Sequence, residues 1–208
     1  GDIHAPVTIS ITAMGELPQS MGLTRAGARP GDDIWVSGCV GGAWAALMHR
    51  WGKLTLDARV FPSAALAMDR PNPRNALGTA LLSSATACAD ISDGLAQDLG
   101  HILERSGVDA DVLWDAVPKH PALAALSQEQ QVEAAMSGGD DYELVFTAPA
   151  DKRGLIEQAS ISALTPVTRI GRIIEKKQSG APLAIRDASG RPLFLPVQGF
   201  DHFAQGAD

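Results

Sequence analysis

Strand-like runs and helix-like segments alternate along almost the whole chain, and this alternation restricts its fold more than any other feature. Residues 34–37 (Ile-Trp-Val-Ser) form a short apolar run typical of a buried strand. From Leu95 onward, four apolar residues recur at positions i, i+4, i+7 and i+8, which places them on one helix face. Gly107 then ends this helix. Interleaved strands and helices predict an α/β or α+β fold, with a mixed β-sheet and helices packed against it.

The remaining segments are predicted from β-branched runs, apolar periodicity, and Gly and Pro stops. We expect strands at residues 7–13, 85–91, 110–114, 142–147 and 167–174, and helices at residues 43–50, 75–84, 128–136 and 151–160. Residues 51–73 show no clear pattern, and the end of the chain is expected to form short strands and loops.

The charge balance and the cysteine content exclude several classes of function. The chain has 208 residues and a net charge of −7, whereas a surface for nucleic acid or an anionic membrane is rich in Lys and Arg. A phosphate ligand remains possible, because Mg²⁺ can supply positive charge while carboxylates hold the metal. Cys39 and Cys88 lack a C-x-x-C spacing, which argues against a zinc site or a disulfide framework and fits a cytoplasmic protein. No apolar run reaches the roughly 18 residues that a membrane helix needs.

Residues 90–95 (Asp-Ile-Ser-Asp-Gly-Leu) are the most informative segment. They place two carboxylates, with a hydroxyl between them, at a predicted turn from strand to helix. At such a turn, free N–H groups and the helix dipole favour phosphate, and carboxylates can hold Mg²⁺ that bridges to the phosphates. The alternative is that Ser92 and Asp93 only cap the helix. The segment by itself leaves both interpretations open.

Two glycine-rich segments give weaker signals. Residues 137–143 (Ser-Gly-Gly-Asp-Asp-Tyr-Glu) combine glycines, which allow close backbone approach to a ligand, with two acids, but a polar turn before a strand has the same composition. Residues 38–42 (Gly-Cys-Val-Gly-Gly) lack the G-x-G-x-x-G spacing of a dinucleotide site, so a tight turn is the better interpretation. Arg25 is either a solvated loop charge or a phosphate contact.

Taken together, these segments resemble the thiamine-monophosphate kinases. Residues 90–102 are similar to the signature of that family, and residues 137–144 are similar to its Ser-Gly-Gly-Glu-Asp-Tyr-Glu-Leu segment. Residues 24–32, 70–74 (Arg-Pro-Asn-Pro-Arg) and 199–203 (Gly-Phe-Asp-His-Phe) also resemble family segments, in the same order and at the same spacing. The resemblance extends over nearly the whole chain.

The resemblance implies a domain organisation. This family belongs to the superfamily of aminoimidazole ribonucleotide synthetase, in which an N-terminal domain carries further metal ligands and the dimer contact. This chain resembles only the C-terminal part of such a two-domain protein. We expect residues 1–30 to be the end of an inter-domain segment with a strand and a loop, and residues 31–208 to be the C-terminal α/β domain. Without the N-terminal ATP- and metal-binding domain, we expect this chain alone to be inactive.

The resemblance also implies roles for individual residues. Asp2, Asp90 and Asp93 would bind Mg²⁺, and Asp93 would be the catalytic residue. Gly1, Asp2, Arg25 and Ser92 would contact ATP, and Asp140 and Phe200 would contact thiamine monophosphate. The chain departs from the family at two places: it has Asp140 where the family has Glu, and Ile3-His4 where the family has Thr-Thr after Gly-Asp.

The function that the resemblance implies is the ATP- and Mg²⁺-dependent phosphorylation of thiamine monophosphate to thiamine diphosphate, by direct in-line transfer. The full-length protein would be a cytoplasmic homodimer with no nucleic-acid or membrane partner. Two alternatives remain. The first is another member of the superfamily, such as an ATP-dependent dehydratase or ligase. The second is a non-catalytic binding domain with the same fold, against which the intact Asp90, Ser92 and Asp93 argue.

Overall fold

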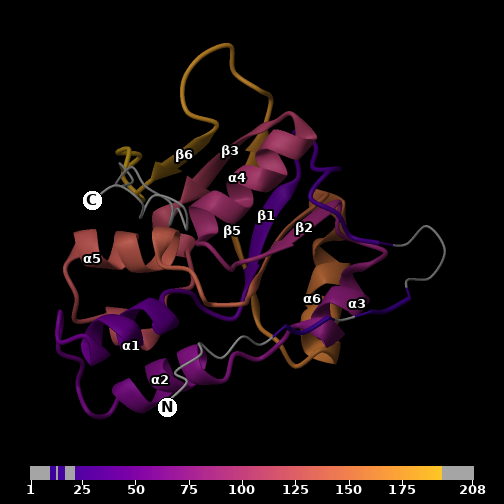
Figure 1. Cartoon of the computed structure of the whole chain (residues 1–208). Helices are drawn as coiled ribbons and strands as arrows, with labels where there is room; N and C mark the ends of the chain where they lie inside the picture. Colours follow the sequence, from indigo (N-terminus) through magenta and orange to yellow (C-terminus); the bar gives the residue numbers. More distant parts are fainter. Residues whose placement is uncertain (1–9, 13, 17–21, 194–208) are drawn as a thin grey trace, which may run out of the picture.

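The computed structural model describes residues 10–12, 14–16 and 22–193, which form one six-stranded mixed sheet in the order β2-β4-β1-β5-β3-β6 (Figure 1). The strands are β1 (Asp33–Ser37), β2 (Ala87–Asp90), β3 (Asp109–Leu113), β4 (Leu144–Ala148), β5 (Val167–Ile174) and β6 (Leu183–Arg186). Neighbouring strands are antiparallel in the pairs β2–β4, β4–β1, β1–β5 and β5–β3, and the last pair, β3–β6, is parallel. The predicted α/β class with a mixed sheet is confirmed.

The helices cover the sheet on both faces. They are α1 (Gly42–Arg50), α2 (Phe61–Asp69), α3 (Asn75–Leu81), α4 (Leu95–Ser106), α5 (Gln128–Val132) and α6 (Arg153–Ser162). Short 3₁₀ turns occur at Trp114–Ala116, Pro121–Leu123 and Ala150–Lys152, and a π-helical turn, Glu133–Ser137, follows α5. In Figure 1, α3 and α6 lie side by side on one face of the sheet and α4 lies on the other. No helix of the described residues is long and apolar enough to cross a membrane.

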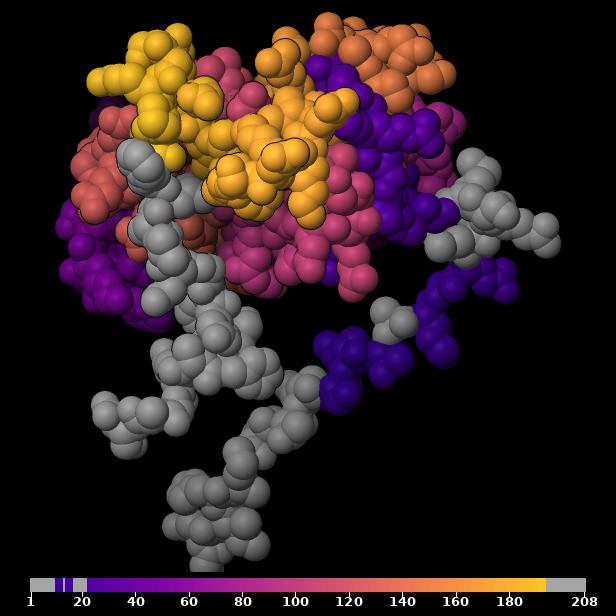
Figure 2. All heavy atoms as spheres, turned by 90° about the horizontal axis from the view of Figure 1, so that it is seen from above, coloured from indigo at the N-terminus to yellow at the C-terminus, as the bar shows by residue number. Residues whose placement is uncertain are grey.

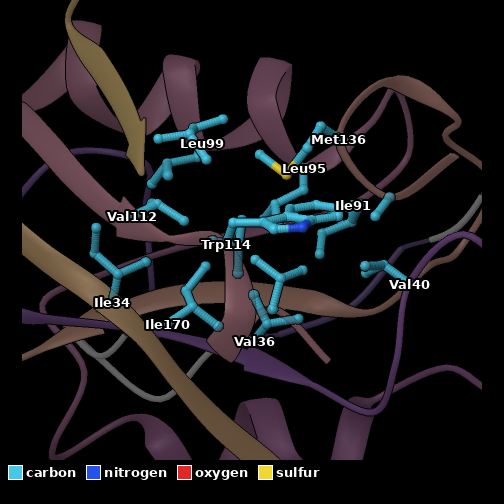
Figure 3. Close-up of a cluster of buried hydrophobic side chains, with 14 of the residues drawn as sticks. Ile34, Val36, Val40, Ile91, Leu95, Leu99, Val112, Trp114, Met136 and Ile170 are labelled. Atoms are coloured by element: carbon cyan, nitrogen blue, oxygen red, sulfur yellow. The ribbon is translucent and has the colours of Figure 1, made fainter. Parts of the chain in front are cut away.

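The central strand β1 separates two hydrophobic clusters, because successive side chains of a strand point to opposite faces. Ile34 and Val36 belong to the larger cluster, which also contains the apolar face of α4. Figure 3 shows this cluster, with Leu95 and Leu99 of α4 above side chains of β1 and β5. Trp35 points the other way and stacks with Phe146, in the cluster that α3 and α6 cover. The buried apolar face of α4 confirms the predicted stripe.

Most predicted elements are present, with shifted ends. Helix α2 was not predicted, and the helix expected at 128–136 is α-helical only to Val132 before its π-helical turn. The strand expected at 142–147 begins later, at Leu144. The strand expected at 7–13 is not found at residues 10–12, and its other residues lie outside the described part of the chain.

The sheet register brings three loops to one edge. Strands β1 and β2 both pair antiparallel with β4, so they run parallel to each other. Val36 pairs with Val145, and Asp90 pairs with Leu144, so β1 and β2 end where β4 begins. The loops at residues 38–41, 91–94 and 138–143 therefore meet at this edge of the sheet.

Candidate functional site

The two segments that the sequence singled out, residues 90–95 and 137–143, are joined by backbone hydrogen bonds. The Ile91 amide donates to the Glu143 carbonyl (2.7 Å), and the Tyr142 amide donates to the Ile91 carbonyl (2.9 Å). Further along, the Asp140 amide donates to the Ser92 carbonyl (2.9 Å). These bonds continue the β2–β4 pairing beyond the strand ends. The structure thus makes one site from two segments far apart in the chain.

Two glycines allow this close approach. Gly94 has φ 118°, and a Cβ there would lie 2.8 Å from the Met136 carbonyl oxygen. Gly139 has φ 65°, and a Cβ there would lie 2.6 Å from the Ser92 carbonyl oxygen. Both the backbone conformation and the lack of space exclude a larger side chain. The glycines therefore bring the two loops into backbone contact.

Asp90 and Asp93 lie on the turn between β2 and α4. Asp90 is exposed at the end of β2, and Asp93 is half-buried. The Asp93 carboxylate accepts hydrogen bonds from the side-chain amide of Gln97 (3.2 Å) and from the Ser92 hydroxyl (3.3 Å). Neither Ser92 nor Asp93 caps α4: the N-cap residue is Gly94, with no side-chain hydrogen bond. The capping-only interpretation is therefore wrong for this structure.

The backbone of this turn is held by a different acid, Asp98, in the first turn of α4. One oxygen of its buried carboxylate, Oδ2, accepts the N–H of Ser92 (2.9 Å) and the N–H of Asp93 (3.0 Å). We expected the N–H groups of this turn to be free for phosphate, and for these two groups that expectation is wrong. Burial raises the pKa of Asp98, the two N–H donors offset part of this rise, and the charges of Asp93 and Asp90 add to it.

Asp140 and Tyr142 lie on the opposing loop, both exposed and both in the left-handed backbone region (φ 58° and 50°). Such a conformation costs roughly 1–3 kcal/mol for a non-glycine residue, and such strain is concentrated at functional sites. The Tyr142 hydroxyl donates to Asp140 Oδ1 (3.1 Å). The pKa of the Tyr142 phenol is raised, first by burial and next by the charge and hydrogen bond of Asp140. The charges of Asp90 and Asp93 add smaller contributions. The Tyr142 phenol is therefore hydrogen-bonded to Asp140, and its pKa also responds to the charges of the two acids on the other loop.

Glu143 lies behind this loop, buried, and joins three elements. The Arg74 guanidinium donates to both of its carboxylate oxygens, through Nε (2.7 Å) and a terminal nitrogen. The Ser37 hydroxyl donates to Glu143 Oε2 (2.5 Å) and accepts from the Leu144 amide (2.8 Å). Arg74 ends the Arg-Pro-Asn-Pro-Arg segment at residues 70–74. The ion pair therefore connects this segment to the end of β1 and to the candidate site.

Asp141 connects the site to helix α1. The backbone N–H of Gly41, the N-cap residue of α1, donates to both carboxylate oxygens of Asp141, at 3.0 Å (Oδ1) and 2.8 Å (Oδ2). Burial raises the pKa of Asp141 to about 7, against the opposing effect of the N–H donors of Gly41 and Ala43, and the charges of Glu143 and Asp140 add to the rise. The sequence left Asp141 open between a candidate ligand site and a polar turn, and this contact was missed because Gly41 is about a hundred residues away in the chain.

Of the other predicted site residues, Arg25 is described by the structure and is not part of this cluster. Gly1, Asp2 and Phe200 lie outside the described residues. The Arg25 carbonyl accepts from the hydroxyl of Ser106 (3.2 Å), the last residue of α4, whereas Asp93 precedes the first. At 1.5 Å per residue, these ends are about 16 Å apart. Figure 2 views the molecule from above, where the indigo N-terminal segment lies along the outside of the pink and orange segments. The ATP contact of Arg25 stays a prediction.

The donor chemistry of the turn fits Mg²⁺. Among the described residues, no group of three or more His, Cys, Asp or Glu side chains could hold a metal ion by itself. Asp90 and Asp93 offer the carboxylate oxygens that Mg²⁺ prefers, and Mg²⁺ in phosphate-transfer sites usually has only one or two protein carboxylates, with the other ligands coming from water and phosphate. The described residues thus fit part of a shared metal site.

The fold and the site define the class of protein. The family model described as "AIR synthase related protein, C-terminal domain" matches residues 29–183, about three quarters of the chain. The chain belongs to this family.

Within this family, the chain is similar to individual proteins of one kind. The chain is 39% identical over 203 residues to the thiamine-monophosphate kinase of Haemophilus influenzae, and this match covers 96% of the chain and 61% of the relative. The crystal structure of thiamine-monophosphate kinase from Stenotrophomonas maltophilia K279a superposes with a TM-score of 0.74 at 40% identity, covering 81% of this chain and 54% of that one. AaThiL complexed with AMPPCP and TMP gives a TM-score of 0.68 at 28% identity, covering 87% and 54%. The resemblance to thiamine-monophosphate kinases is confirmed, and the chain spans about three fifths of the length of the curated relatives it matches.

Proposed function

We propose that the full-length protein is a kinase that uses ATP and Mg²⁺ to convert thiamine monophosphate to thiamine diphosphate. Relatives named thiamine-monophosphate kinase at 37–39% identity support this, as does the similar structure complexed with AMPPCP and TMP. The observation that carries the proposal is the set of backbone hydrogen bonds between residues 90–94 and residues 138–143, because it puts the carboxylates proposed to bind the metal and an exposed candidate substrate contact on adjoining loops.

The proposed chemistry requires charge neutralisation more than a strong base. Donor and acceptor are both anionic phosphates, which repel each other, so positioning and electrostatic stabilisation carry the reaction. Bound Mg²⁺ supplies the neutralising charge. Asp90 and Asp93, with Asp2, would hold the metal, and Asp93 is the proposed catalytic residue. Transfer would be direct and in line, without a phosphoenzyme.

The remaining assigned residues would bind the two substrates. Ser92, whose hydroxyl already contacts Asp93, would contact the nucleotide together with Gly1, Asp2 and Arg25. Asp140 would contact thiamine monophosphate from the opposing loop, and Phe200 would complete that side. Asp is one methylene shorter than the Glu that the family has at this position, a difference of about 1.5 Å. A bridging water could fill that gap.

The proposal extends to the setting of the enzyme. We propose that residues 1–30 end an inter-domain segment and that residues 31–208 form the C-terminal domain of a cytoplasmic homodimer. The net charge of −7 supports the absence of a nucleic-acid or membrane partner. Light scattering on the full-length protein measures the oligomeric state.

The test is phosphorylation of thiamine monophosphate by the purified full-length protein, with Asp93→Asn as the diagnostic variant. Asn keeps the shape of the side chain but removes the charge that would hold Mg²⁺, so we expect turnover to be lost while the melting temperature stays near wild type. Asp151→Asn is the control, an exposed acid beyond the far end of β4, and it should leave turnover unchanged. Wild-type protein without activity on thiamine monophosphate, or full activity in Asp93→Asn, would refute the proposal.

A further inference from the structure

Asp98 is a buried acid close to the candidate site that the proposed chemistry does not use. Its residue surface is 1% exposed, and its side chain lies beneath the turn that carries Asp90 and Asp93. One carboxylate oxygen accepts both the Ser92 and the Asp93 N–H, at 2.9 Å and 3.0 Å. A buried carboxylate is costly unless hydrogen-bonded, and here two N–H donors and the positive end of α4 compensate for it.

This arrangement changes which ligands the turn can bind. A strand-to-helix turn usually attracts anions through its free N–H groups. Here two of those groups are already bonded to a carboxylate within the chain, and the same carboxylate adds a negative charge behind Asp90 and Asp93. The turn therefore favours a cation over a bare phosphate.

We propose that Asp98 is a positioning residue that dedicates this turn to a divalent cation, by holding the Ser92–Asp93 backbone and occupying the donors that a metal-free phosphate would bind. The inference rests on the proposed function only in taking that cation to be the Mg²⁺ that accompanies the nucleotide. Groups that fix metal ligands from behind typically change metal affinity 10- to 100-fold when removed.

Two substitutions separate the charge of Asp98 from its hydrogen bonds. In Asp98→Asn, the amide oxygen can still accept both N–H groups, so only the negative charge is lost. In Asp98→Ala, both N–H groups are released. Asp32→Asn is the matched control, because Asp32 is also buried and accepts the Arg29 N–H (3.0 Å) and the Thr86 hydroxyl (2.7 Å). Thr86 precedes β2, so this control lies at the other end of the strand from Asp90.

The experiment measures ligand binding by the full-length protein with the non-hydrolysable ATP analogue AMPPCP, so that turnover is not the readout. Calorimetry gives the affinity for AMPPCP with Mg²⁺ and, separately, with EDTA. We expect Asp98→Ala to weaken Mg²⁺-dependent binding 10- to 100-fold and to strengthen metal-free binding. We expect Asp98→Asn to weaken Mg²⁺-dependent binding by less, and Asp32→Asn to change neither affinity. Amide hydrogen exchange should show faster exchange at Ser92 and Asp93 only in Asp98→Ala.

The outcomes distinguish this inference from the proposed function. A uniform loss of both affinities in Asp98→Ala would mean a merely structural role and would overturn the inference, as would unchanged Mg²⁺ dependence or no Mg²⁺-dependent binding by the wild type. If Asp98→Ala does not fold, unchanged Mg²⁺-dependent affinity in Asp98→Asn would overturn it and a loss would support it. Wild-type protein that shows the Mg²⁺ effect but does not phosphorylate thiamine monophosphate would refute the function and leave the role of Asp98 standing.

Discussion

Replacing Glu143 by Gln should destabilise the fold more than a typical surface change, because it leaves the Arg74 charge without its partner. The side chains of the pair are 7% (Glu143) and 17% (Arg74) exposed, and the guanidinium bonds both carboxylate oxygens. Breaking a buried pair by removing one partner typically costs about 3–5 kcal/mol. Gln can keep one acceptor for the Ser37 hydroxyl, so we expect the lower end, about 3 kcal/mol.

The reciprocal change, Arg74→Met, should cost a similar amount, because it strands the buried carboxylate. Since either single change already breaks the pair, the double variant should cost well under the sum, with a coupling energy of about 1–3 kcal/mol. Asp57→Asn provides the control: Asp57 pairs with Arg59 on the surface, where the side chains are 50% and 89% exposed. An exposed pair of this kind contributes little to stability, so Asp57→Asn should leave the free energy of unfolding close to the wild-type value.

Urea unfolding of the 208-residue chain, followed by tryptophan fluorescence and circular dichroism, measures these free energies. Two results would refute the reasoning: a cost below about 1 kcal/mol for Glu143→Gln, or costs that add fully in the double variant. Because the Glu143 carbonyl also accepts the Ile91 amide, the variant should shift the loop at residues 91–94 as well. In the full-length protein, activity should therefore fall together with stability.

Three further predictions concern the same edge of the sheet. The pKa of the Asp141 carboxyl is raised to about 7 from an ordinary value of 3.8, so this group stabilises the fold while protonated and loses that contribution as pH rises through 7. In urea unfolding, the free energy of unfolding of the wild type should therefore fall by about 2–3 kcal/mol more than that of Asp141→Asn between pH 5 and pH 8. Equal dependence of the two free energies on pH would contradict this. In the full-length enzyme, Asp140→Ala should raise KM for thiamine monophosphate before KM for ATP, and Asp140→Glu should be tolerated, whereas equal damage to both KM values would mean that Asp140 only shapes the turn. Gly139→Ala should lower the melting temperature by several degrees, because its Cβ would lie 2.6 Å from the Ser92 carbonyl oxygen, and an unchanged melting temperature would show that the loops can separate without cost.

Local patterns predicted the elements better than their partners. The apolar stripe of α4 and its end at Gly107 follow from helical spacing and a glycine stop, and the structure has both. Helix α2 was missed because only Ala64 of its nine residues is buried and the helix begins with Phe61-Pro62, where proline at the first turn marks a helix start rather than a break. Strand order was not predictable, since a two-residue period says nothing about which strands pair.

The candidate site was predicted only in part, because local patterns do not show which segments are neighbours in the fold. Residues 90–95 and 137–143 were recognisable from glycines beside acids, but their backbone bonding depends on β2 and β4 being neighbours. The local rule that Ser or Asp before a helix forms its cap was overridden by Asp98, an acid inside the helix whose carboxylate reaches back to the turn. Glu143 was visible as part of a segment, but its pairing with Arg74 is a tertiary contact.

Four carboxylates of this edge, Asp90, Asp98, Asp140 and Glu143, differ in burial, and the difference indicates what each one does. Asp98 and Glu143 are buried, and each is bonded to donors of the chain itself: two backbone N–H groups in the first case, and a guanidinium and a hydroxyl in the second. Asp90 and Asp140 are exposed on the two joined loops. Removing a buried acid of this kind leaves its donors without a partner, which costs stability. An exposed acid can be removed at little cost to the fold, so its effect should appear in ligand binding instead.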